Sequence, residues 1–208
     1  MIQTTGLSYA YDAQAEFRFP DIHLADAENL VILGESGIGK TTLLHLLAGL
    51  LVAKTGKVLI NNTDITQLGA RELDHFRGNN MGFVFQKPYF VKSLSLIDNL
   101  LLLQYLAGRK SDQTKIKQVL DRLGIKDKER KKTYQLSQGE QQRASIAMAI
   151  INDPKIILAD EPTSSLDDKN CLNVTTLLKS QASATGANLV VITHDQRLKT
   201  QFENQLQL

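Results

Sequence analysis

The fold of this 208-residue chain is decided by one glycine-rich stretch, Gly34-Glu35-Ser36-Gly37-Ile38-Gly39-Lys40-Thr41. The stretch matches the pattern G-x-x-x-x-G-K-[ST], in which glycines let the backbone wrap closely so that its N–H groups point at a phosphate. An apolar run at residues 30–33 predicts a strand before it, and residues 41–51 predict a helix after it. Such a helix directs its positive end at the anion. We therefore expect a phosphate-binding loop in which Lys40 reaches the β- and γ-phosphates and the Thr41 hydroxyl binds Mg²⁺.

A second motif supplies the acid that a phosphate site needs to hold a metal ion. It is an apolar run followed by two carboxylates, Ile156-Ile157-Leu158-Ala159-Asp160-Glu161. Such runs are typical of strands covered on both faces of a parallel sheet, and ligands bind at the carboxyl ends of these strands. Asp160 is expected to hold Mg²⁺, and Glu161 to orient the attacking water and accept its proton. Alone, the motif also describes a strand end with solvated acids; beside the phosphate loop it favours nucleotide hydrolysis.

Four further motifs carry a family resemblance. ABC-family ATPases have a signature motif, usually LSGGQ, and it resembles the stretch Leu136-Ser137-Gln138-Gly139-Glu140-Gln141-Gln142-Arg143. The family's Q-loop, D-loop and switch-histidine strand resemble, in turn, Phe83-Val84-Phe85-Gln86, Pro162-Thr163-Ser164-Ser165-Leu166-Asp167 and Val191-Ile192-Thr193-His194-Asp195. The motifs follow the family's order, and the resemblance covers nearly the whole chain.

The resemblance implies an α/β fold, that of a P-loop NTPase with a parallel-sheet core, a small N-terminal antiparallel β subdomain and a helical insertion that carries the signature. Residues 57–60, 81–85 and 189–193 predict further strands. Residues 95–151 lack strand-like runs, so we expect helices there, broken near Gly108 and Gly124. No repeat or linker divides the chain, which predicts a single ABC ATPase domain over residues 1–208 with the insertion at about 88–152.

The resemblance also implies the residues of a site for ATP and Mg²⁺. Catalytic roles would fall to Glu161, to His194, which would hold the γ-phosphate, and to Gln86, which would sense metal and water. The metal would be held by Thr41, Gln86 and Asp160. The residues expected to contact the nucleotide are Tyr11, Gly34, Ser36, Gly37, Gly39, Lys40, Thr41, Thr42, Ser137, Gly139 and Asp167. An aromatic late in the first strand would stack on the base; we favour Tyr11 over Tyr9, and the alternative is that either tyrosine is strand surface.

A head-to-tail homodimer is the assembly that the resemblance implies, with two ATP molecules at its interface. One chain's phosphate loop would face the other chain's Ser137 hydroxyl, Gly139 N–H and helix N-terminus, which close the γ-phosphate off from water. The signature has Gln138 where the family usually has glycine, and Glu140 where it usually has glutamine. Because Ser137 and Gly139 are intact, we expect activity to survive both departures.

Composition limits the partners of the protein. The net charge of +2 makes no case for nucleic acid as a partner. The charge-rich stretch at residues 126–132 is expected to be a solvated helix face. The N-terminus shows no signal peptide, and the apolar segments at residues 43–53 and 94–107 are too short to span a bilayer. Together with the resemblance, this predicts a cytoplasmic protein held on the inner face of the cell membrane only by transmembrane permease subunits.

The favoured function is the ATP-binding, ATP-hydrolysing subunit of an ABC transporter that powers export or release of a substrate through separate membrane subunits. Within the family, Arg71-Glu72-Leu73 and residues 81–86 resemble the lipoprotein-release and macrolide-export group. The alternative is a soluble ABC ATPase of DNA repair or translation, although the chain has no room for the long coiled coil of the repair members. A third hypothesis, a nucleotide-binding regulator without turnover, conflicts with the intact Lys40, Asp160, Glu161 and His194.

The membrane subunit is expected to dock between the sheet core and the helical insertion, near residues 86–106. Gln86 would touch metal and water, and it opens directly into the insertion. The connection that follows is unusually apolar and aromatic, Lys87-Pro88-Tyr89-Phe90-Val91, and aromatics are favoured at interface centres. The alternative is that Tyr89 and Phe90 pack inside the insertion.

Overall fold

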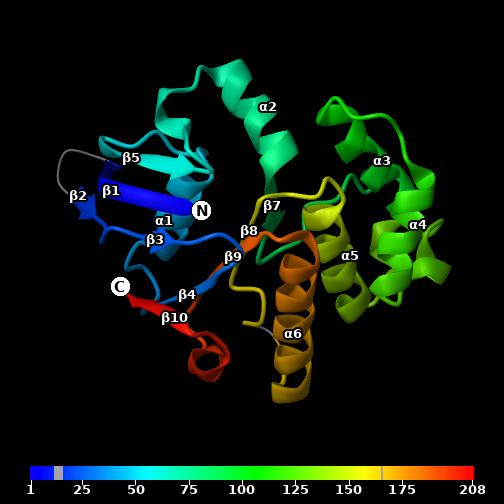
Figure 1. The fold of residues 1–208 in the computed structure, drawn as a ribbon. Coiled ribbons are helices and arrows are strands. Elements are labelled where there is room, and N and C mark those ends of the chain that lie inside the picture. Colours follow the sequence, from blue (N-terminus) through cyan, green and yellow to red (C-terminus); the bar gives the residue numbers. More distant parts are fainter. Residues whose placement is uncertain (12–15, 165) are drawn as a thin grey trace.

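A five-stranded parallel sheet forms the centre of the protein (Figure 1). The computed structural model describes residues 1–11, 16–164 and 166–208. The strands are ordered β10-β4-β9-β8-β7, and each pair is parallel. Their bounds are β4 Asn29–Leu33, β7 Met81–Val84, β8 Ile156–Asp160, β9 Asn188–Thr193 and β10 Asn204–Gln207. The expected core strands are confirmed to within about one residue at each end, whereas β10 has no counterpart among them.

A second, antiparallel sheet packs beside the phosphate loop and is ordered β2-β1-β5-β6, with β3 paired to β1. Its strands are β1 Ile2–Ala10, β2 Glu16–Arg18, β3 His23–Leu24, β5 Thr55–Ile60 and β6 Thr63–Asp64. The expected antiparallel β subdomain is thereby confirmed, and the strand expected at residues 57–60 begins earlier, at Thr55. The subdomain is N-terminal only in part, because β5 follows the phosphate loop and pairs back onto β1, and β6 pairs onto β5.

Helices cover the parallel sheet on both faces (Figure 1). The α-helices are α1 Lys40–Leu47, α2 Ala70–Asn80, α3 Leu96–Leu106, α4 Gln113–Arg122, α5 Gln138–Ile150 and α6 Asp168–Thr185. Short 3₁₀ turns are η1 Ile65–Gln67, η2 Lys126–Lys128, η3 Thr133–Gln135 and η4 Gln196–Gln201. The breaks expected after the first two helices of the insertion are confirmed, since Gly108 and Gly124 have left-handed φ angles of 70° and 66°. Glycine ends helices in this conformation without steric cost.

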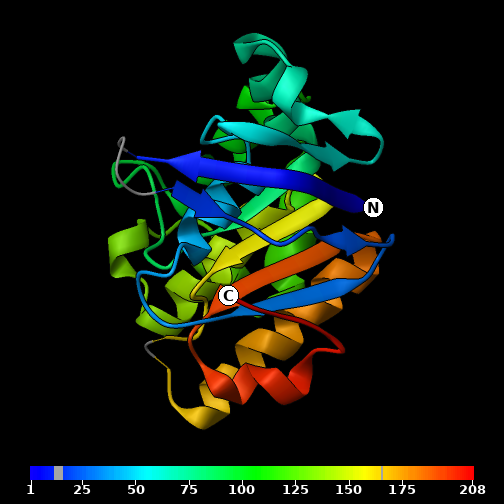
Figure 2. The ribbon, with the colours of Figure 1, turned by 90° about the vertical axis from the view of Figure 1, so that its left-hand side faces the viewer.

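The parallel sheet has a different partner on each face, as the alternation within β4 shows. Leu30 and Ile32 belong to a core shared with α1 and the antiparallel sheet. Val31 and Leu33 belong to a core shared with α3, α4, α5 and α6. Figure 2 shows β8, β9 and β4 (yellow, orange and blue) side by side, with β1 above them. Because both faces are covered, these strands are continuous apolar runs rather than alternating ones.

The close approach of β7 and α5 depends on Gly82. A Cβ at this position would collide with the backbone oxygen of Ala149 and lie 2.9 Å from its carbonyl carbon. Backbone atoms cannot yield as the end of a flexible side chain can, so this position has room only for hydrogen. The contact sets how closely α5, which begins with the signature-like motif, lies against the strand that leads to Gln86.

We expect Gly82→Ala to destabilise the protein by about 1–3 kcal/mol or more, because the added methyl overpacks a backbone contact and forces α5 away from β7. For a chain of this size each kcal/mol lowers the melting temperature by about 2–4 °C. Gly69→Ala is the control, since its Cβ would meet the Glu72 carboxylate at an ordinary 3.4 Å; its cost should be limited to that of alanine as the N-cap of α2, about 1 kcal/mol or less. If scanning fluorimetry gives Gly82→Ala the same melting temperature as the parent protein, β7 and α5 do not make this contact.

Candidate active site

A cavity of about 310 Å³ opens where β4, β8 and β9 end, beside the start of α1. Its lining comes from segments far apart in the chain: Tyr11, Phe17, Ser36, Gly37, Gly39, Lys40, Thr41, Thr42, Gln86, Asp160, Glu161 and His194. Apart from Phe17, the sequence analysis predicts each of them as a site residue. The carboxyl ends of parallel strands meet at one edge of the sheet, which is why these distant loops converge.

The loop between β4 and α1 curls around its own lysine. Gly37 and Gly39 have left-handed φ angles of 85° and 108°, which glycine adopts without strain. A Cβ at Gly39 would also lie 2.8 Å from the ring of Phe17. The buried Lys40 donates from Nζ to the backbone oxygen of Gly34 at 2.9 Å and to that of the next residue at 2.8 Å. Gly34 therefore shapes the loop through its carbonyl, although it is not among the described residues that line the cavity.

Thr41 and Asp160 supply oxygen atoms that fit a divalent cation. The Thr41 hydroxyl donates to Asp160 Oδ2 at 3.5 Å. Burial raises the pKa of the Asp160 carboxyl, and the negative charge of adjoining Glu161 raises it further. Two adjoining carboxylates in a partly buried site are a setting that a cation stabilises. Mg²⁺ prefers such oxygen donors and takes only one or two carboxylates beside phosphate and water. No cluster of three or more His, Cys, Asp and Glu side chains offers a metal another site in the described part of the chain.

Glu161 is positioned by its own backbone and by the end of β9. Its φ of 47° lies in the left-handed region, which costs a non-glycine residue on the order of 1–3 kcal/mol and persists only where the surroundings enforce it. Here its N–H donates to the Ile192 oxygen at 2.9 Å, which extends the β8–β9 pairing. Its carboxylate accepts from Thr193 Oγ1 at 2.9 Å and from the His194 N–H at 3.1 Å, and lies 2.8 Å from His194 Nδ1. The carboxylate and the imidazole thus form one hydrogen-bonded unit in the cavity.

The aromatic side of the cavity contains Tyr11 and Phe17. Tyr11 is 62% exposed and lines the cavity, and its hydroxyl lies 2.9 Å from Thr42 Oγ1. Tyr9 instead packs against the core shared by α1 and the antiparallel sheet. Phe17 stands edge-on to Tyr11, with ring centroids 6.1 Å apart. The geometry favours Tyr11 over Tyr9. Phe17 escapes the sequence analysis because only the pairing of β1 with β2, which sets Phe17 opposite Tyr9, brings its ring to the loop.

Gln86 is linked to the turn that carries Glu161 by a short chain of hydrogen bonds. Gln86 Nε2 donates to Ser164 Oγ at 3.4 Å, and Ser164 Oγ donates to the backbone oxygen of Glu161 at 3.2 Å. Ser165, the next residue of the expected D-loop, lies outside the described residues.

The signature-like residues face a different part of the molecule. Ser137 caps α5, with its Oγ accepting from the Glu140 N–H at 3.4 Å and its N–H donating to Glu140 Oε2 at 2.8 Å. This reciprocal capping gives the unusual Glu140 a structural role. Gly139 and Asp167 line a second cavity of about 430 Å³ between the starts of α5 and α6. Ser137, Gly139 and Asp167 are not among the described residues around the first cavity.

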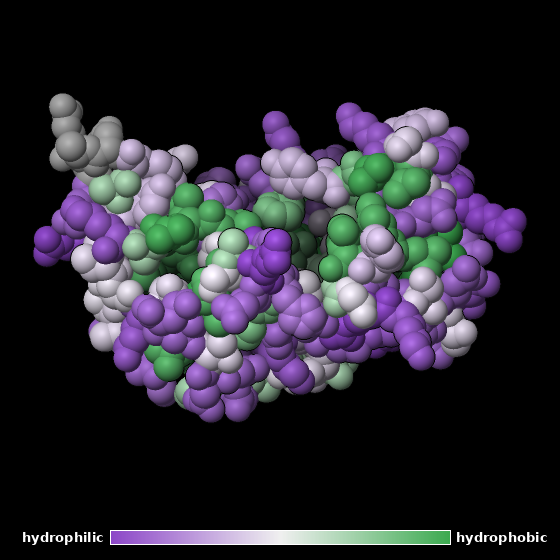
Figure 3. All heavy atoms as spheres, turned by 90° about the horizontal axis from the view of Figure 1, so that it is seen from above, coloured by the Kyte–Doolittle hydropathy of each residue, from purple (hydrophilic) through white to green (hydrophobic). Residues whose placement is uncertain are grey.

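An apolar groove of about 580 Å³ runs between α2, β7, α3 and α5. Seen from above, hydrophobic side chains gather on both sides of a hollow in this face (Figure 3). Phe83, Phe85 and Tyr89 form a ladder of rings along the groove, with centroids 5.3 Å and 5.0 Å apart. Tyr89 is 73% exposed, whereas Phe90 packs against the core that the sheet shares with α3, α4, α5 and α6. The alternative that the side chain packs inside therefore holds for Phe90, and docking at Tyr89 stays a prediction.

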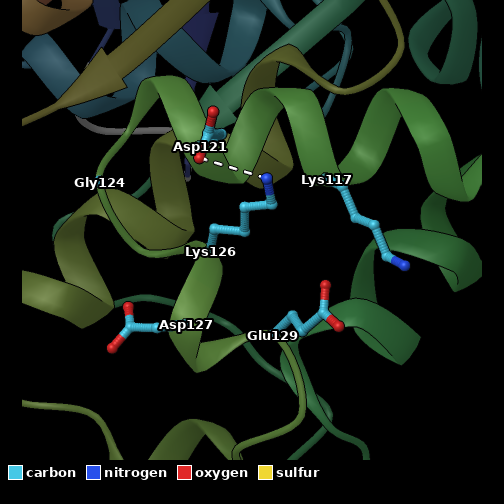
Figure 4. A pocket seen from close by; sticks show the side chains of 6 residues that line it. All are labelled: Lys117, Asp121, Gly124, Lys126, Asp127 and Glu129. Atoms are coloured by element: carbon cyan, nitrogen blue, oxygen red, sulfur yellow. Dashed lines mark ion pairs between the residues drawn. The ribbon is translucent and has the colours of Figure 1, made fainter.

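The charge-rich stretch at residues 126–132 lines a pocket of about 530 Å³ between α4 and η2 (Figure 4). Lys126 pairs with Asp121 at 3.5 Å, while Asp127 points away from the other labelled side chains. Both signs of charge alternate around the pocket, as on a solvated surface. The stretch forms a short 3₁₀ turn and an irregular segment, so the expectation of a helix face is wrong in its secondary structure.

Comparison with known proteins agrees with this arrangement of motifs. The family model described as ABC transporter matches residues 20–164, which include the phosphate loop, Gln86, the signature-like motif and both acids. The chain belongs to the ABC transporter family. It is an ATP-binding subunit of such a transporter and an ATPase. This decides between the transporter hypothesis and the soluble ATPase of DNA repair or translation.

Relatives of this ABC transporter subunit cover most of its length. The lipoprotein-releasing system ATP-binding protein LolD of Shewanella frigidimarina (strain NCIMB 400) is 36% identical over 188 residues, or 89% of this chain and 79% of the relative. The dimeric structure of MJ0796, a bacterial ABC transporter cassette, has a TM-score of 0.89 and 30% identity over 100% of this chain and 94% of that one. A dimeric post-hydrolysis state of MJ0796 bound to ADP and Pi matches with a TM-score of 0.89 and 29% identity over the same shares. None of the helices in the described residues combines the length and the hydropathy of a membrane span.

We expect Glu161→Gln to bind ATP but to lower its turnover by about 10²–10⁴-fold, because an amide cannot accept the proton of the attacking water. The variant should therefore accumulate with ATP bound, which size-exclusion chromatography with labelled nucleotide measures. Glu203→Gln, at an exposed position outside the cavity, is the control and should hydrolyse ATP normally. Near-normal phosphate release by Glu161→Gln would exclude Glu161 as the base.

Proposed function

We propose that this ABC ATPase works as a head-to-tail homodimer on the cytoplasmic face of the cell membrane and energises release or export of a lipoprotein-like substrate through separate permease subunits. The observation that carries the proposal is the division of the motifs between two cavities. The phosphate loop, both acids and His194 line one cavity, and Gly139 and Asp167 line the other. Two copies arranged head to tail would bring these halves together. The substrate class rests on the LolD relative and on the subgroup resemblance at residues 71–86.

ATP would bind with its base against Tyr11 and Phe17 and its phosphates in the loop. The Lys40 ammonium is already buried and held by two carbonyl oxygens, so little ordering is needed for it to meet the β- and γ-phosphates. Thr41, Asp160 and Gln86 would hold Mg²⁺. When bound, this ion neutralises charge that develops on the phosphates during the reaction.

Hydrolysis would use Glu161 as the general base. Its carboxylate orients a water molecule and accepts the proton as the water oxygen bonds to the γ-phosphorus and the bond to the bridging oxygen breaks. Thr193 and His194 restrain that carboxylate through three contacts of 2.8–3.1 Å, which limits the geometry to one arrangement. The Nδ1 atom of His194 faces Glu161, which leaves Nε2 for the γ-phosphate. Because both partners are acceptors, His194 would hold both only with hydrogen on both ring nitrogens.

The neighbouring subunit would complete the site from the side that one chain leaves open. Its Ser137 hydroxyl and Gly139 N–H lie at the start of α5, where the positive end of the helix dipole favours an anion. Such preorganised donors stabilise charge without reorganisation when they are closed against a phosphate. Asp167, at the start of α6, would lie beside the same interface.

We expect Ser137→Arg to retain nucleotide affinity as a monomer and to lose turnover, because Ser137 acts on the neighbour's ATP. Lys40→Ala should instead weaken nucleotide binding itself, which titration with a fluorescent nucleotide measures. A mixture of the two variants would form some dimers with one doubly altered site and one intact site. Partial ATPase activity should therefore return on mixing. Normal hydrolysis by Ser137→Arg alone would contradict the head-to-tail arrangement.

The apolar groove beside the insertion is the proposed docking site for a permease subunit. Its aromatic ladder begins on β7, and the same segment passes through Gln86 in the nucleotide cavity. A partner helix seated there would contact Tyr89 and the α3 side chains Leu103 and Leu106. Movement of the insertion on ATP binding would thus reach the partner through Gln86.

Tyr89→Glu is expected to leave melting temperature and basal ATPase unchanged and to abolish recovery of the subunit with its membrane complex, because a charge replaces an exposed ring of the groove. Val52→Glu is the matched control, since Val52 is 87% exposed on the connection from α1 to β5. Co-purification from detergent-solubilised membranes measures the outcome. Full recovery of Tyr89→Glu with the complex would place the interface elsewhere.

A further inference from the structure

The guanidinium of Arg197, in η4, connects the segment that follows β9 to the segment that begins α6. Nε donates to Asp195 Oδ1 at 2.8 Å and to Oδ2 at 3.0 Å, and Nη2 donates to Oδ2 at 2.7 Å. Nη1 donates to Asp168 Oδ1 at 2.6 Å, and Nη2 also donates to the backbone oxygen of Leu166 at 3.2 Å. One planar group therefore holds a carboxylate on one side and the start of α6 on the other.

Asp195 is fixed from its other side as well. Thr163 Oγ1 donates to Asp195 Oδ2 at 3.2 Å, and the Asp195 N–H donates to Thr193 Oγ1 at 3.0 Å. Thr193 Oγ1 is the same hydroxyl that donates to the Glu161 carboxylate. Only 9% of the Asp195 side chain is exposed, and its hydrogen bonds from Arg197 lower its pKa to about 2. The pair is thus ionised and rigid, because charge-assisted forked contacts of this kind are strong and directional.

The residues that Arg197 joins belong to the two cavities described above. Asp195 directly follows His194, which lines the nucleotide cavity. Leu166 and Asp168 flank Asp167, and Leu166 and Asp167 line the second cavity. Arg197 is not among the described residues that line either cavity. Its contacts to Asp195 on one side and to Leu166 and Asp168 on the other fix how these two loops lie relative to each other.

We propose that Arg197 is a positioning residue that couples the D-loop to His194 and Glu161. Contact of the D-loop with the neighbouring subunit would then fix the positions of the His194 and Glu161 side chains. The coupling rests on the proposed head-to-tail dimer. A guanidinium transmits such a shift because its donors are fixed in one plane, whereas the ammonium of lysine is a single flexible point charge. A displacement of about 1 Å at a catalytic group can cost about 10²-fold in rate.

The test uses Arg197→Met and Arg197→Lys in the full chain, with kcat, KM and the Kd of a fluorescent ATP analogue measured for each. Arg197→Met should lower kcat by about tenfold or more, with Kd unchanged to within about twofold. Arg197→Lys should recover part of the loss, because it restores charge without the fork. Lys199→Met is the control, since Lys199 is an exposed cation of the same 3₁₀ turn, and it should match the parent.

Asp168→Ala keeps the proposal testable even if Arg197→Met fails to fold. The Asp168 side chain is 92% exposed, so its removal cuts one contact of the guanidinium without opening the core. The variant should lower kcat by about two- to fivefold, because the free energy of an exposed ion pair corresponds to a factor of this size. The Kd and the melting temperature should stay constant. In the Arg197→Met background Asp168→Ala should have no further effect, because residues that act through one contact are not additive.

Parent-like kcat in Arg197→Met or Asp168→Ala would overturn the proposal. So would a fall in kcat matched by an equal loss of nucleotide affinity, because that is the result of a purely structural role. Failure of the dimer proposal is distinguishable. It would appear as normal hydrolysis by Ser137→Arg, whatever the Arg197 variants do.

Discussion

The parallel pairing of β4, β9 and β8 is the constraint on which the active site depends. In this register Leu33 pairs with Thr193, and Asp160 pairs with Ile192. The three strands therefore end at one edge, and the phosphate loop, the two acids and the histidine follow those ends directly. The Glu161 N–H continues the ladder by one further bond to Ile192, at the expense of a left-handed backbone. A slip of one residue would turn each of these side chains to the opposite face of the sheet.

The polar groups of the site are restrained by the protein itself. Lys40 is held by carbonyl oxygens of its own loop, Glu161 by Thr193 and His194, and the Tyr11 hydroxyl by Thr42. Each functional group has a partner that fixes its direction, which is the condition for electrostatic preorganisation. Burial and the neighbouring charge of Glu161 raise the pKa of Asp160, and it is the group for which a cation is the natural partner.

The second cavity lies between the starts of α5 and α6, two helices that pack against the same parallel sheet. Helix α5 lies against β7 because Gly82 has no side chain, and its first residues carry the Ser137–Glu140 capping box. At this position glutamate completes the capping box as the usual glutamine can, so the departure at Glu140 is compatible with an ordered helix start. The segment that follows β7 enters the nucleotide cavity at Gln86 and continues to the outer surface. The segment that follows β9 leads from the same cavity to Asp195 and Arg197, which lie outside it. This is why contacts outside the nucleotide cavity are placed to influence it.

The sequence by itself determined the chemistry, because phosphate and metal binding require particular residue types at short, fixed spacings. Residues 34–41 and the Asp160-Glu161 pair are recognisable for that reason. His194 was identified through the family resemblance, the core strands through their apolar runs, and the helix ends through Gly108 and Gly124. Only the tertiary structure placed Tyr11 and Phe17 in the cavity lining and Tyr9 against the core, added β10, and separated exposed Tyr89 from packed Phe90. It also decided that Arg197 joins two loops. These outcomes depend on strand register and on the direction of single side chains, which are set by contacts between residues distant in the chain and leave no local pattern.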